Sequence, residues 1–297
     1  MTTTSLHIPL PGRPDNVVRL SDGRLLGYAE FGDPAGKPVM FFHGFPGSRV
    51  EGALGHDAAE RAGVRLICID RPGMGLSTFQ PGRRMVDWPA DVAALADALS
   101  IGRFAVGGVS GGGPYAAVCA LRLADRLTGA AIISGVAPFN IPGAMDGINR
   151  MNRVLFFLGR RAPWLARVPM LLMARVARSP DRAIDLMLRT VPAPDRAILQ
   201  RPAVRTAAAA DLAEPYRGGT RGPAWELVLY SRAWGFRLED IHMDVHLWQG
   251  EADTNVPPAM GRYQADVIPR CKATFYPGEG HLLFIDRMEE ILGAIAG

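Results

Sequence analysis

Short apolar runs alternate with helical segments along the first part of this chain, and this alternation limits the folds open to it. The apolar runs at 37–44 and 63–73 are bounded by glycine and proline, and similar runs follow at 103–110 and 127–137. Such runs are typical of strands buried on both faces of a parallel sheet. Between them, helices are expected at 48–62, 85–102 and 111–125. The sequence therefore predicts an α/β fold with a mostly parallel central sheet flanked by helices.

A long helical block interrupts this alternation. From residue 138 to residue 240 the chain has helical character, five methionines and repeated prolines. Strands are expected again at 243–250 and 272–278, followed by a final helix at 282–296. We therefore predict a core formed by 1–137 and 241–297, with a helical cap inserted at 138–240 over the carboxyl edge of the sheet.

The charge of the chain is concentrated in the expected cap. The 297 residues carry a formal net charge of +4, yet residues 143–237 contain 16 Arg against 7 Asp and Glu. The arginines are scattered and lack the interleaved aromatic residues of a nucleic-acid platform. We interpret them as solvated helix faces, and we expect neither a nucleic-acid partner nor a membrane partner.

We expect an intracellular protein, because the sequence shows no recognisable targeting signal and its cysteines have no pattern of disulfides or metal ligands. No segment approaches the roughly 18 apolar residues of a membrane span, and residues 1–15 contain no apolar core of the length found in signal peptides. Cys68, Cys119 and Cys271 are far apart and have no metal-ligand spacing. We expect them to be free, buried thiols in a cytoplasmic protein.

A glycine-rich turn between an expected strand and an expected helix carries the clearest chemical signal. Gly108-Val109-Ser110-Gly111-Gly112 fits G-x-S-x-G, a strand-to-helix turn that exposes a nucleophilic serine. Gly108 and Gly112 would permit the tight elbow, and Ser110 would lie at the amino end of a helix that favours negative charge. A phosphate-binding turn is the alternative, but no G-x-x-x-x-G-K-[ST] motif supports it.

A nucleophilic serine needs a base, and the base needs an acid that orients it. His281, in "GEGHLLF", lies after a strand and before the last helix, at the sheet edge expected to carry Ser110. The loop after the preceding strand supplies Asp253, which we prefer to the neighbouring Glu251 because Glu251 follows the strand too closely. The sequence therefore predicts a catalytic triad of Ser110, Asp253 and His281.

These motifs together resemble the α/β-hydrolase superfamily over nearly the whole chain. The matching segments are "HGFPGS", "DRPGMGLS", "GVSGGG", "GEADTNVPP" and "GEGH". The resemblance implies an oxyanion hole made by the backbone N–H groups of Phe45 and Gly111, with His43 in a structural role. It also identifies Asp70–Ser77 as the family's loop after the fourth strand, a structural turn. A glycine at position 111 is expected to leave extra room beside the nucleophile.

The resemblance implies hydrolysis of an ester-like bond (a carboxylic ester, lactone or thioester) in a small hydrophobic substrate, without a metal or an organic cofactor. Proline iminopeptidase-like and carbon–carbon bond hydrolase activities are alternatives, the first depending on cap acids such as Glu214 and Glu226. A ligand receptor of this fold with little turnover is an alternative of another class. The sequence does not indicate the oligomeric state.

Overall fold

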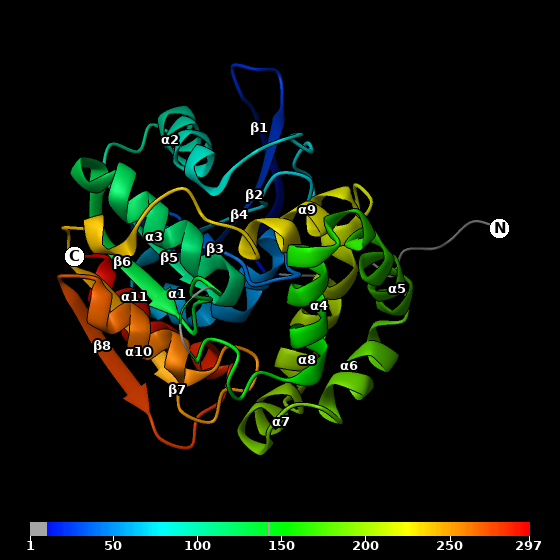
Figure 1. The fold of residues 1–297 in the computed structure, drawn as a ribbon. Helices are drawn as coiled ribbons and strands as arrows, with labels where there is room; N and C mark the ends of the chain where they lie inside the picture. The colour runs from blue at the N-terminus through cyan, green and yellow to red at the C-terminus, as the bar shows by residue number, and fades with distance from the viewer. Residues whose placement is uncertain (1–10, 140, 142) are drawn as a thin grey trace.

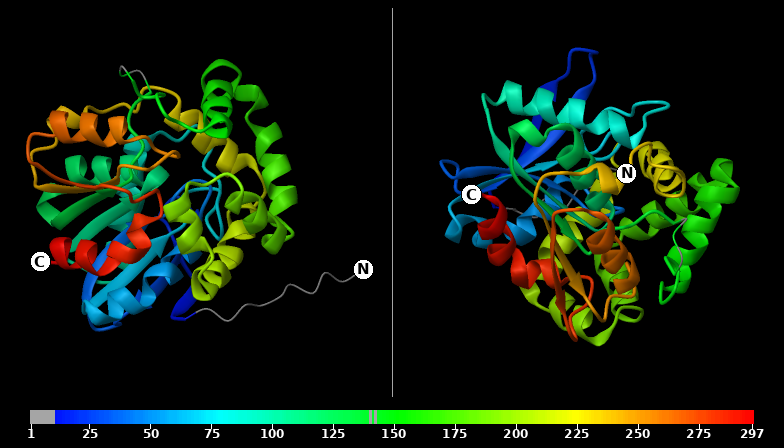
Figure 2. Two further views of the ribbon diagram at one scale, coloured as in Figure 1. Left: turned by 90° about the horizontal axis from the view of Figure 1, so that it is seen from below. Right: turned by 60° about the vertical axis from the view of Figure 1, so that its left-hand side comes forward.

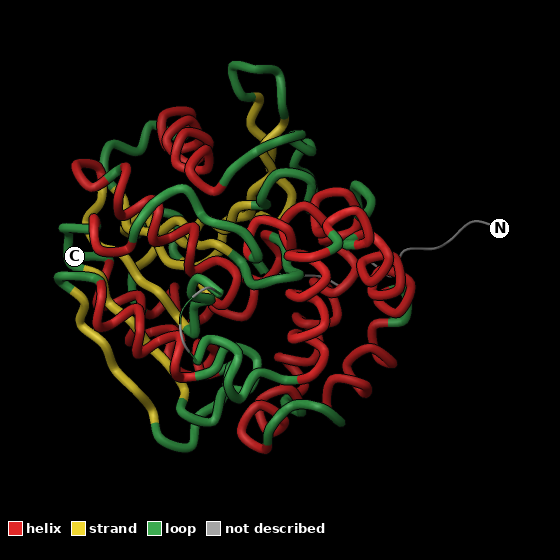
Figure 3. Tube along the Cα trace, in the orientation of Figure 1, coloured by secondary structure: helices red, strands yellow, loops and turns green. Residues whose placement is uncertain are grey.

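The computed structural model describes residues 11–139, 141 and 143–297. Residues 1–10, 140 and 142 lie outside the described residues, so most of the segment considered for a signal peptide is not part of the description. The fold is drawn in Figure 1 and, coloured by secondary structure, in Figure 3.

An eight-stranded sheet forms the centre of the molecule, with strand order β1-β2-β4-β3-β5-β6-β7-β8. The pairs β1/β2 and β2/β4 are antiparallel, and all other neighbours are parallel. This confirms the predicted α/β fold with a mostly parallel sheet. The strands are β1 Arg13–Arg19, β2 Leu25–Gly32, β3 Lys37–Phe42, β4 Val64–Ile69, β5 Phe104–Val109, β6 Leu127–Ile133, β7 Val245–Gly250 and β8 Cys271–Tyr276.

Both faces of the sheet are covered, which explains why its strands are apolar at successive positions. Met40 and Phe42 of β3 belong to the core cluster packed under one set of helices, and Val39 and Phe41 belong to the cluster on the other face. Alternate side chains of a strand point to opposite faces, so both sets must be apolar. On the first face lie α2 Trp88–Ala98, α3 Gly113–Arg122 and α10 Pro258–Val267, and on the second lie α1 His56–Arg61 and α11 Leu283–Ile295.

Among the described residues, six α-helices lie between β6 and β7 and gather on one side of the sheet (Figures 1 and 2). Proline stands at the first position of α6 and of α8, where it has no intrahelical hydrogen bond to lose. These helices occupy part of the proposed cap, 138–240. They are α4 Arg150–Arg161, α5 Arg167–Ala177, α6 Pro180–Leu188, α7 Ala193–Leu199, α8 Pro202–Ala213 and α9 Arg221–Tyr230.

The proposed cap has two layers. Helix α8 packs on Arg49–Gly55 of the core, and Tyr230 of α9 contacts Gly111 of the core, whereas α4, α5 and α6 pack on α8 and α9. Figure 2 keeps α4 and α5, drawn in green, on the side away from the sheet in both views. We call α7, α8 and α9 the inner layer, and α4, α5 and α6 with the short helix Pro163–Leu165 the outer layer.

Two further expectations concern membrane-spanning helices and the state of the cysteines. In the part that the structure describes, no helix is both long and apolar enough to cross a membrane. All three cysteines are free, as expected; Cys68 and Cys119 are buried, but Cys271 at the start of the edge strand β8 is only half-buried.

Candidate active site

Ser110 stands at the sharp turn between β5 and α3. Its φ is +55°, in the left-handed region that is uncommon for residues with a side chain. A Cβ atom at Gly108 would lie 2.2 Å from the carbonyl oxygen of Gly112, and one at Gly112 would lie 2.0 Å from that of Phe42. The backbone passes itself so closely here that neither glycine can carry a side chain, and the half-buried Ser110 projects from the turn.

His281 and Asp253 are in direct contact at the carboxyl edge of the sheet. The Nδ1 atom of His281 lies 2.8 Å from Oδ2 of Asp253, and both residues are buried. The other carboxylate oxygen, Oδ1, accepts the backbone N–H groups of Asn255 and Val256 at 2.8 and 2.9 Å. Asp253 is thus held by its own loop. This leaves Nε2 of His281 as the ring nitrogen that can exchange a proton with another group.

Asp253, rather than the neighbouring Glu251, contacts the histidine. The carboxylate of Glu251 instead pairs with Arg262 at 2.5 Å, on α10. The described hydrogen bonds include none between Ser110 and His281. The structure therefore shows Asp253 in contact with His281, but no hydrogen bond from the serine to the histidine. Side chains of this kind often approach one another only when substrate is bound.

The charges around His281 favour its protonated form. Burial acts to lower the pKa of His281, but the carboxylates of Asp253, Asp195 and Glu51 have the greater effect, so the pKa lies above its ordinary value. A base with a raised pKa holds a proton more readily, which suits a residue that accepts one from a serine hydroxyl and later returns it.

Phe45 and Gly111, the residues expected to form an oxyanion hole, lie side by side. A Cβ atom at Gly111 would be 2.8 Å from Cβ of Phe45. The carbonyl of Gly44 belongs to the same peptide group as the N–H of Phe45, and it accepts Nη2 of Arg71 at 2.8 Å. The opposite end of that planar group, the N–H of Phe45, is therefore fixed in direction as well.

The N–H of Gly111 is oriented in a similar way. It shares a peptide group with the carbonyl of Ser110, which accepts the N–H of Val136 at 3.0 Å. Gly111 also lies in the first turn of the helical segment Ser110–Gly112, where backbone N–H groups have no partner within the helix. The directions of both N–H groups are therefore fixed by hydrogen bonds to the carbonyl oxygens of the same peptide groups.

His43 is enclosed under the same loop. Its Nδ1 atom lies 2.8 Å from the carbonyl oxygen of Gly44, and Nε2 accepts the N–H of Arg71 at 3.3 Å. Burial, reinforced by the positive charges of Arg71 and Arg83, keeps the pKa of His43 well below its ordinary value. A neutral ring that donates to one backbone segment and accepts from another is suited to shaping the loop.

The expected room beside Gly111 is already filled, so that expectation was wrong. A Cβ atom at Gly111 would lie 2.5 Å from the hydroxyl oxygen of Tyr230, which comes from α9 in the inner layer of the cap. The Tyr230 hydroxyl oxygen also lies 2.9 Å from the carbonyl oxygen of Gly111. A glycine is required here because the tyrosine approaches the backbone closely, and not because substrate needs the space.

Glu226, also on α9, is the centre of a buried ionic network that sequence reasoning did not connect to the site. Its carboxylate accepts Nε of Arg71 at 2.6 Å and the Tyr230 hydroxyl at 2.7 Å, and it pairs with Arg83. Burial acts to raise the pKa of Glu226, but Arg83 and Arg71 outweigh it and lower the pKa. Through Arg71 and Tyr230, this one carboxylate reaches both sides of the expected oxyanion hole.

Two more cap acids hold core loops. Asp195 of α7 is buried and accepts the N–H groups of His281 and Leu282 at 3.0 and 2.8 Å, just before α11. Glu214 pairs with Arg49 of the core at 2.8 Å. The two cap acids named in connection with iminopeptidases, Glu214 and Glu226, are thus both paired with arginines of the core.

Glu51 is a further acid close to the serine. Its carboxylate accepts the N–H of Gly44, and a Cβ atom at Gly44 would lie 3.2 Å from Oε2 of Glu51 and 3.6 Å from Cβ of Ser110. Burial raises the pKa of Glu51 to about 7, although the N–H of Gly44 and the charge of Arg71 act in the opposite direction. Its position after "HGFPGS" was the only sequence signal that could have identified it.

The loop Asp70–Ser77 borders this region as a structural turn. The Asp70 carboxylate accepts the backbone N–H groups of Arg49 and Leu76 at 2.7 and 2.8 Å, tying two loops together. Within residues 11–139, 141 and 143–297, no three His, Cys, Asp or Glu side chains are grouped in a way that could hold a metal ion.

The fold agrees with comparisons to known proteins. A model of the alpha/beta hydrolase fold family matches residues 37–287, and the chain belongs to that family. Within it, the chain is 37% identical over 124 residues to a non-heme chloroperoxidase of Streptomyces lividans, covering 41% of this chain and 45% of the relative. It is 34% identical over 127 residues to a bifunctional esterase/perhydrolase of Acinetobacter calcoaceticus, covering 42% and 46%.

The matched region thus spans less than half the length of these curated relatives. Among solved structures, an alpha/beta hydrolase fold protein from Nakamurella multipartita superposes with a TM-score of 0.64 at 23% identity, covering 94% of this chain and 99% of the other. At that identity the likeness concerns the fold.

Proposed function

We propose that this protein is a serine hydrolase that cleaves an ester-like bond of a small hydrophobic substrate. Ser110 is the nucleophile, His281 the base and Asp253 the acid that orients the base. The backbone N–H groups of Phe45 and Gly111 form the oxyanion hole. The observation that carries the proposal is the buried contact between His281 and Asp253, at the same sheet edge as a serine with a φ of +55°.

The reaction follows from these positions. Nε2 of His281 takes the proton of Ser110 as its oxygen attacks the carbonyl carbon, and the two N–H groups stabilise the resulting oxyanion. When the tetrahedral intermediate collapses, His281 gives its proton to the departing alcohol or thiol. A water molecule, deprotonated by His281, then attacks the acyl-enzyme, and the acid leaves as the hydroxyl of Ser110 re-forms.

The first experiment is the hydrolysis of p-nitrophenyl esters of increasing acyl length by the wild type and by Ser110→Ala. We expect short to medium esters to turn over, and Ser110→Ala to be slower by about a thousandfold or more. Ser134→Ala is a matched control, because Ser134 directly follows the neighbouring strand β6 and also has a left-handed φ, of +44°. Equal rates for wild type and Ser110→Ala would disprove the assignment of Ser110 as the nucleophile.

Labelling with a fluorophosphonate separates the enzyme from a receptor of the same fold. Covalent modification of Ser110 together with ester turnover supports the hydrolase. Modification without turnover of any ester in the series would favour the receptor alternative, in which the pocket binds a ligand and the serine is retained.

Perhydrolysis is a second candidate activity, favoured by the names of the relatives. One is a bifunctional esterase/perhydrolase and another a non-heme chloroperoxidase. In this reaction hydrogen peroxide replaces water as the nucleophile, so the acyl-enzyme gives a peracid and free Ser110. Mixing an ester, hydrogen peroxide and bromide with the enzyme and following the bromination of a dye tests it. Ser110→Ala must abolish peracid formation and ester hydrolysis together.

A further inference from the structure

The outer layer of the cap exposes an unusual amount of apolar surface. Of the eleven large apolar side chains that are most exposed among the described residues, ten lie between 151 and 187. Trp164 is 77% exposed and Leu172 is 62% exposed. The others in this region are Met151, Val154, Phe157, Val168, Leu171, Val176, Leu186 and Met187.

These side chains form the second apolar face of helices whose first face is already buried. In α4, Leu155 and Phe156 pack into the core, while Met151, Val154 and Phe157 point outward. In α5, Met170 is fully buried while its neighbours Leu171 and Leu172 are exposed. The exposed residues are therefore not needed for packing the cap, and apolar patches on this scale mark interaction surfaces.

The same surface is strongly positive. Residues 150–189 contain nine arginines, two aspartates and no lysine, which gives this segment a net charge of +7. All nine arginines are exposed, and none of them forms an ion pair with another described residue. The two aspartates, Asp181 and Asp185, lie next to Arg205 on α8 instead.

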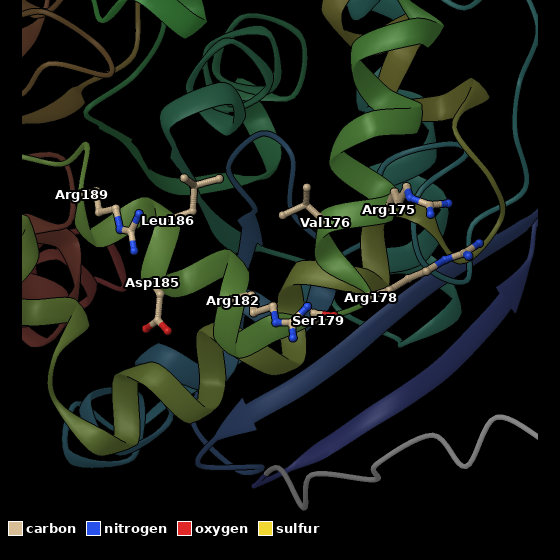
Figure 4. Close-up of a pocket in the computed structure, with 8 residues that line it drawn as sticks. All are labelled: Arg175, Val176, Arg178, Ser179, Arg182, Asp185, Leu186 and Arg189. Carbon is tan, nitrogen blue, oxygen red and sulfur yellow. The ribbon is translucent and has the colours of Figure 1, made fainter.

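A hollow between α5 and α6 gathers four of these arginines. Its volume is about 730 Å³, and none of its lining residues belongs to the proposed triad. Figure 4 shows Val176 and Leu186 projecting into the space from the two helices, with arginines distributed around its edge. These arginines are Arg175, Arg178, Arg182 and Arg189.

We propose that the outer face of the cap, residues 150–189, docks onto an anionic lipid surface. Arginine side chains contact the phosphate groups, and the exposed Trp, Phe and Leu side chains enter the boundary between headgroups and acyl chains. This is the composition of helices that lie in a membrane interface without crossing it. The proposal does not depend on the proposed triad.

The charge argues against two other occupants. A second copy of this chain, seated face to face, would oppose nine unpaired arginines with nine more, and like charges in contact disfavour association. Nucleic acid would satisfy the arginines but would leave the aliphatic side chains without an apolar partner. A lipid surface satisfies both. The inference replaces the sequence-based interpretation of solvated helix faces, because the apolar exposure is visible only in the fold.

Vesicle co-sedimentation of the full chain tests the proposal. We expect binding to phosphatidylcholine vesicles that contain roughly 30 mol % phosphatidylglycerol, weakened by salt, and little binding to phosphatidylcholine alone. Trp164 provides a second readout, because the other four tryptophans are buried or half-buried. Its emission should shift to shorter wavelength as anionic vesicles are added.

Two variants separate the charge from the apolar contribution. The triple variant Arg175→Gln, Arg178→Gln, Arg182→Gln should lower the partition coefficient about a hundredfold, since each arginine contributes about fivefold. Trp164→Ala should weaken binding and remove the fluorescence shift. The matched control is Arg19→Gln, Arg103→Gln, Arg122→Gln, which removes three exposed arginines of the core that have no ion pair, and it should bind like the wild type.

Several results would overturn the proposal. One is the absence of binding to either vesicle. Another is a dimer in sedimentation velocity that Trp164→Ala dissociates, which would assign the face to a second copy. Equal loss of binding in the triple variant and its control would show a general charge effect. Binding of inorganic phosphate or duplex DNA as tight as that of vesicles would assign the arginines to a free anion or to nucleic acid.

Discussion

The inner and outer layers of the proposed cap have opposite chemical character, although they belong to one stretch of chain. Three carboxylates of the inner layer and of the segment after α8 contact the core. Asp195 accepts the N–H of His281, Glu214 pairs with Arg49, and Glu226 pairs with Arg71. The outer layer turns unpaired arginines and apolar side chains to the surface. The net charge of residues 143–237 is positive and does not reveal this difference between the layers. The acids in this segment are few, but three of them contact groups of the core.

The difference has a physical origin in burial. A carboxylate enclosed next to backbone N–H groups and guanidinium ions is compensated, and removing it leaves those groups unpaired. An arginine in water loses little when it is replaced. Substitutions in the inner layer are therefore expected to change the stability of the protein and the geometry of the site, whereas substitutions of the exposed side chains of the outer layer should change only what the protein binds.

The largest effect is expected for Glu226→Ala. It leaves Arg71 and Arg83 buried without their carboxylate, which should lower the free energy of unfolding by about 3–5 kcal/mol. It also releases Arg71, which orients the Gly44–Phe45 peptide, so kcat should fall more than KM changes for a short ester. Urea unfolding and steady-state kinetics provide the measurements.

The control for Glu226 is Asp181→Asn, an exposed acid of the outer layer, which should leave stability and kcat unchanged. The pH dependence adds a second check. Because the pKa of Glu226 is lowered in the folded protein, its contribution is complete above the ordinary glutamate pKa. It is lost as the pH falls through the depressed value. A stability difference between Glu226→Ala and wild type that stays constant into strong acid would contradict this account.

Gly111→Ala should have the next largest effect. The added methyl group would meet the Tyr230 hydroxyl and Cβ of Phe45, and overpacking of this kind costs about 1–3 kcal/mol. Tyr230→Phe removes the hydroxyl oxygen that lies closest. The double variant should therefore recover part of the stability lost in Gly111→Ala when both are compared by thermal unfolding. A double variant less stable than the sum of the two single changes would argue against this contact as the cause.

Asp195→Asn tests the inner layer through the proton affinity of His281. The negative charge of Asp195 helps to raise the pKa of His281, so its removal should lower that pKa. In the proposed mechanism the neutral imidazole of His281 is the base, so kcat/KM should rise with pH through the pKa of His281. The acid limb of the wild-type profile should lie above the ordinary histidine value of about 6.5, and that of Asp195→Asn should move to lower pH. Asp185→Asn, an exposed acid, should not move it.

The smallest effects belong to the exposed side chains of the outer layer. Leu171→Gln replaces an exposed side chain and should change the free energy of unfolding by less than about 0.5 kcal/mol. Met170→Ala, one residue earlier, removes a fully buried side chain and should cost about 2–5 kcal/mol. Similar values for the two variants, measured by urea unfolding, would mean that Leu171 is packed in solution and would weaken the assignment of an open apolar face.

Much of the fold and the candidate site could be predicted from the sequence because the signals are local. Apolar runs that alternate with helical segments indicated the sheet, since strands buried on both faces must be apolar throughout. The motif around Ser110 and the loops containing Asp253 and His281 are recognisable because each follows a strand that ends at the same edge. The contact between His281 and Asp253 joins residues only 28 positions apart, in consecutive loops.

The partners that come from the cap could not be predicted in the same way. Tyr230 contacts Gly111 across 119 positions, and Glu226 contacts Arg71 across 155. Nothing in the local sequence distinguishes Glu226, which reaches the site, from Asp181, which faces solvent. The room expected beside Gly111 was inferred from the family resemblance, and it was wrong because a distant tyrosine occupies that volume.

The sequence by itself thus determined the order of strands and helices along the chain and the residues suited to form a triad, because periodicity and turn chemistry act over a few residues. Only the tertiary structure decided which cap acids hold the site, why position 111 must be glycine and which face of each cap helix remains exposed. These depend on how helices pack against one another, and packing is set by contacts between residues far apart in the chain.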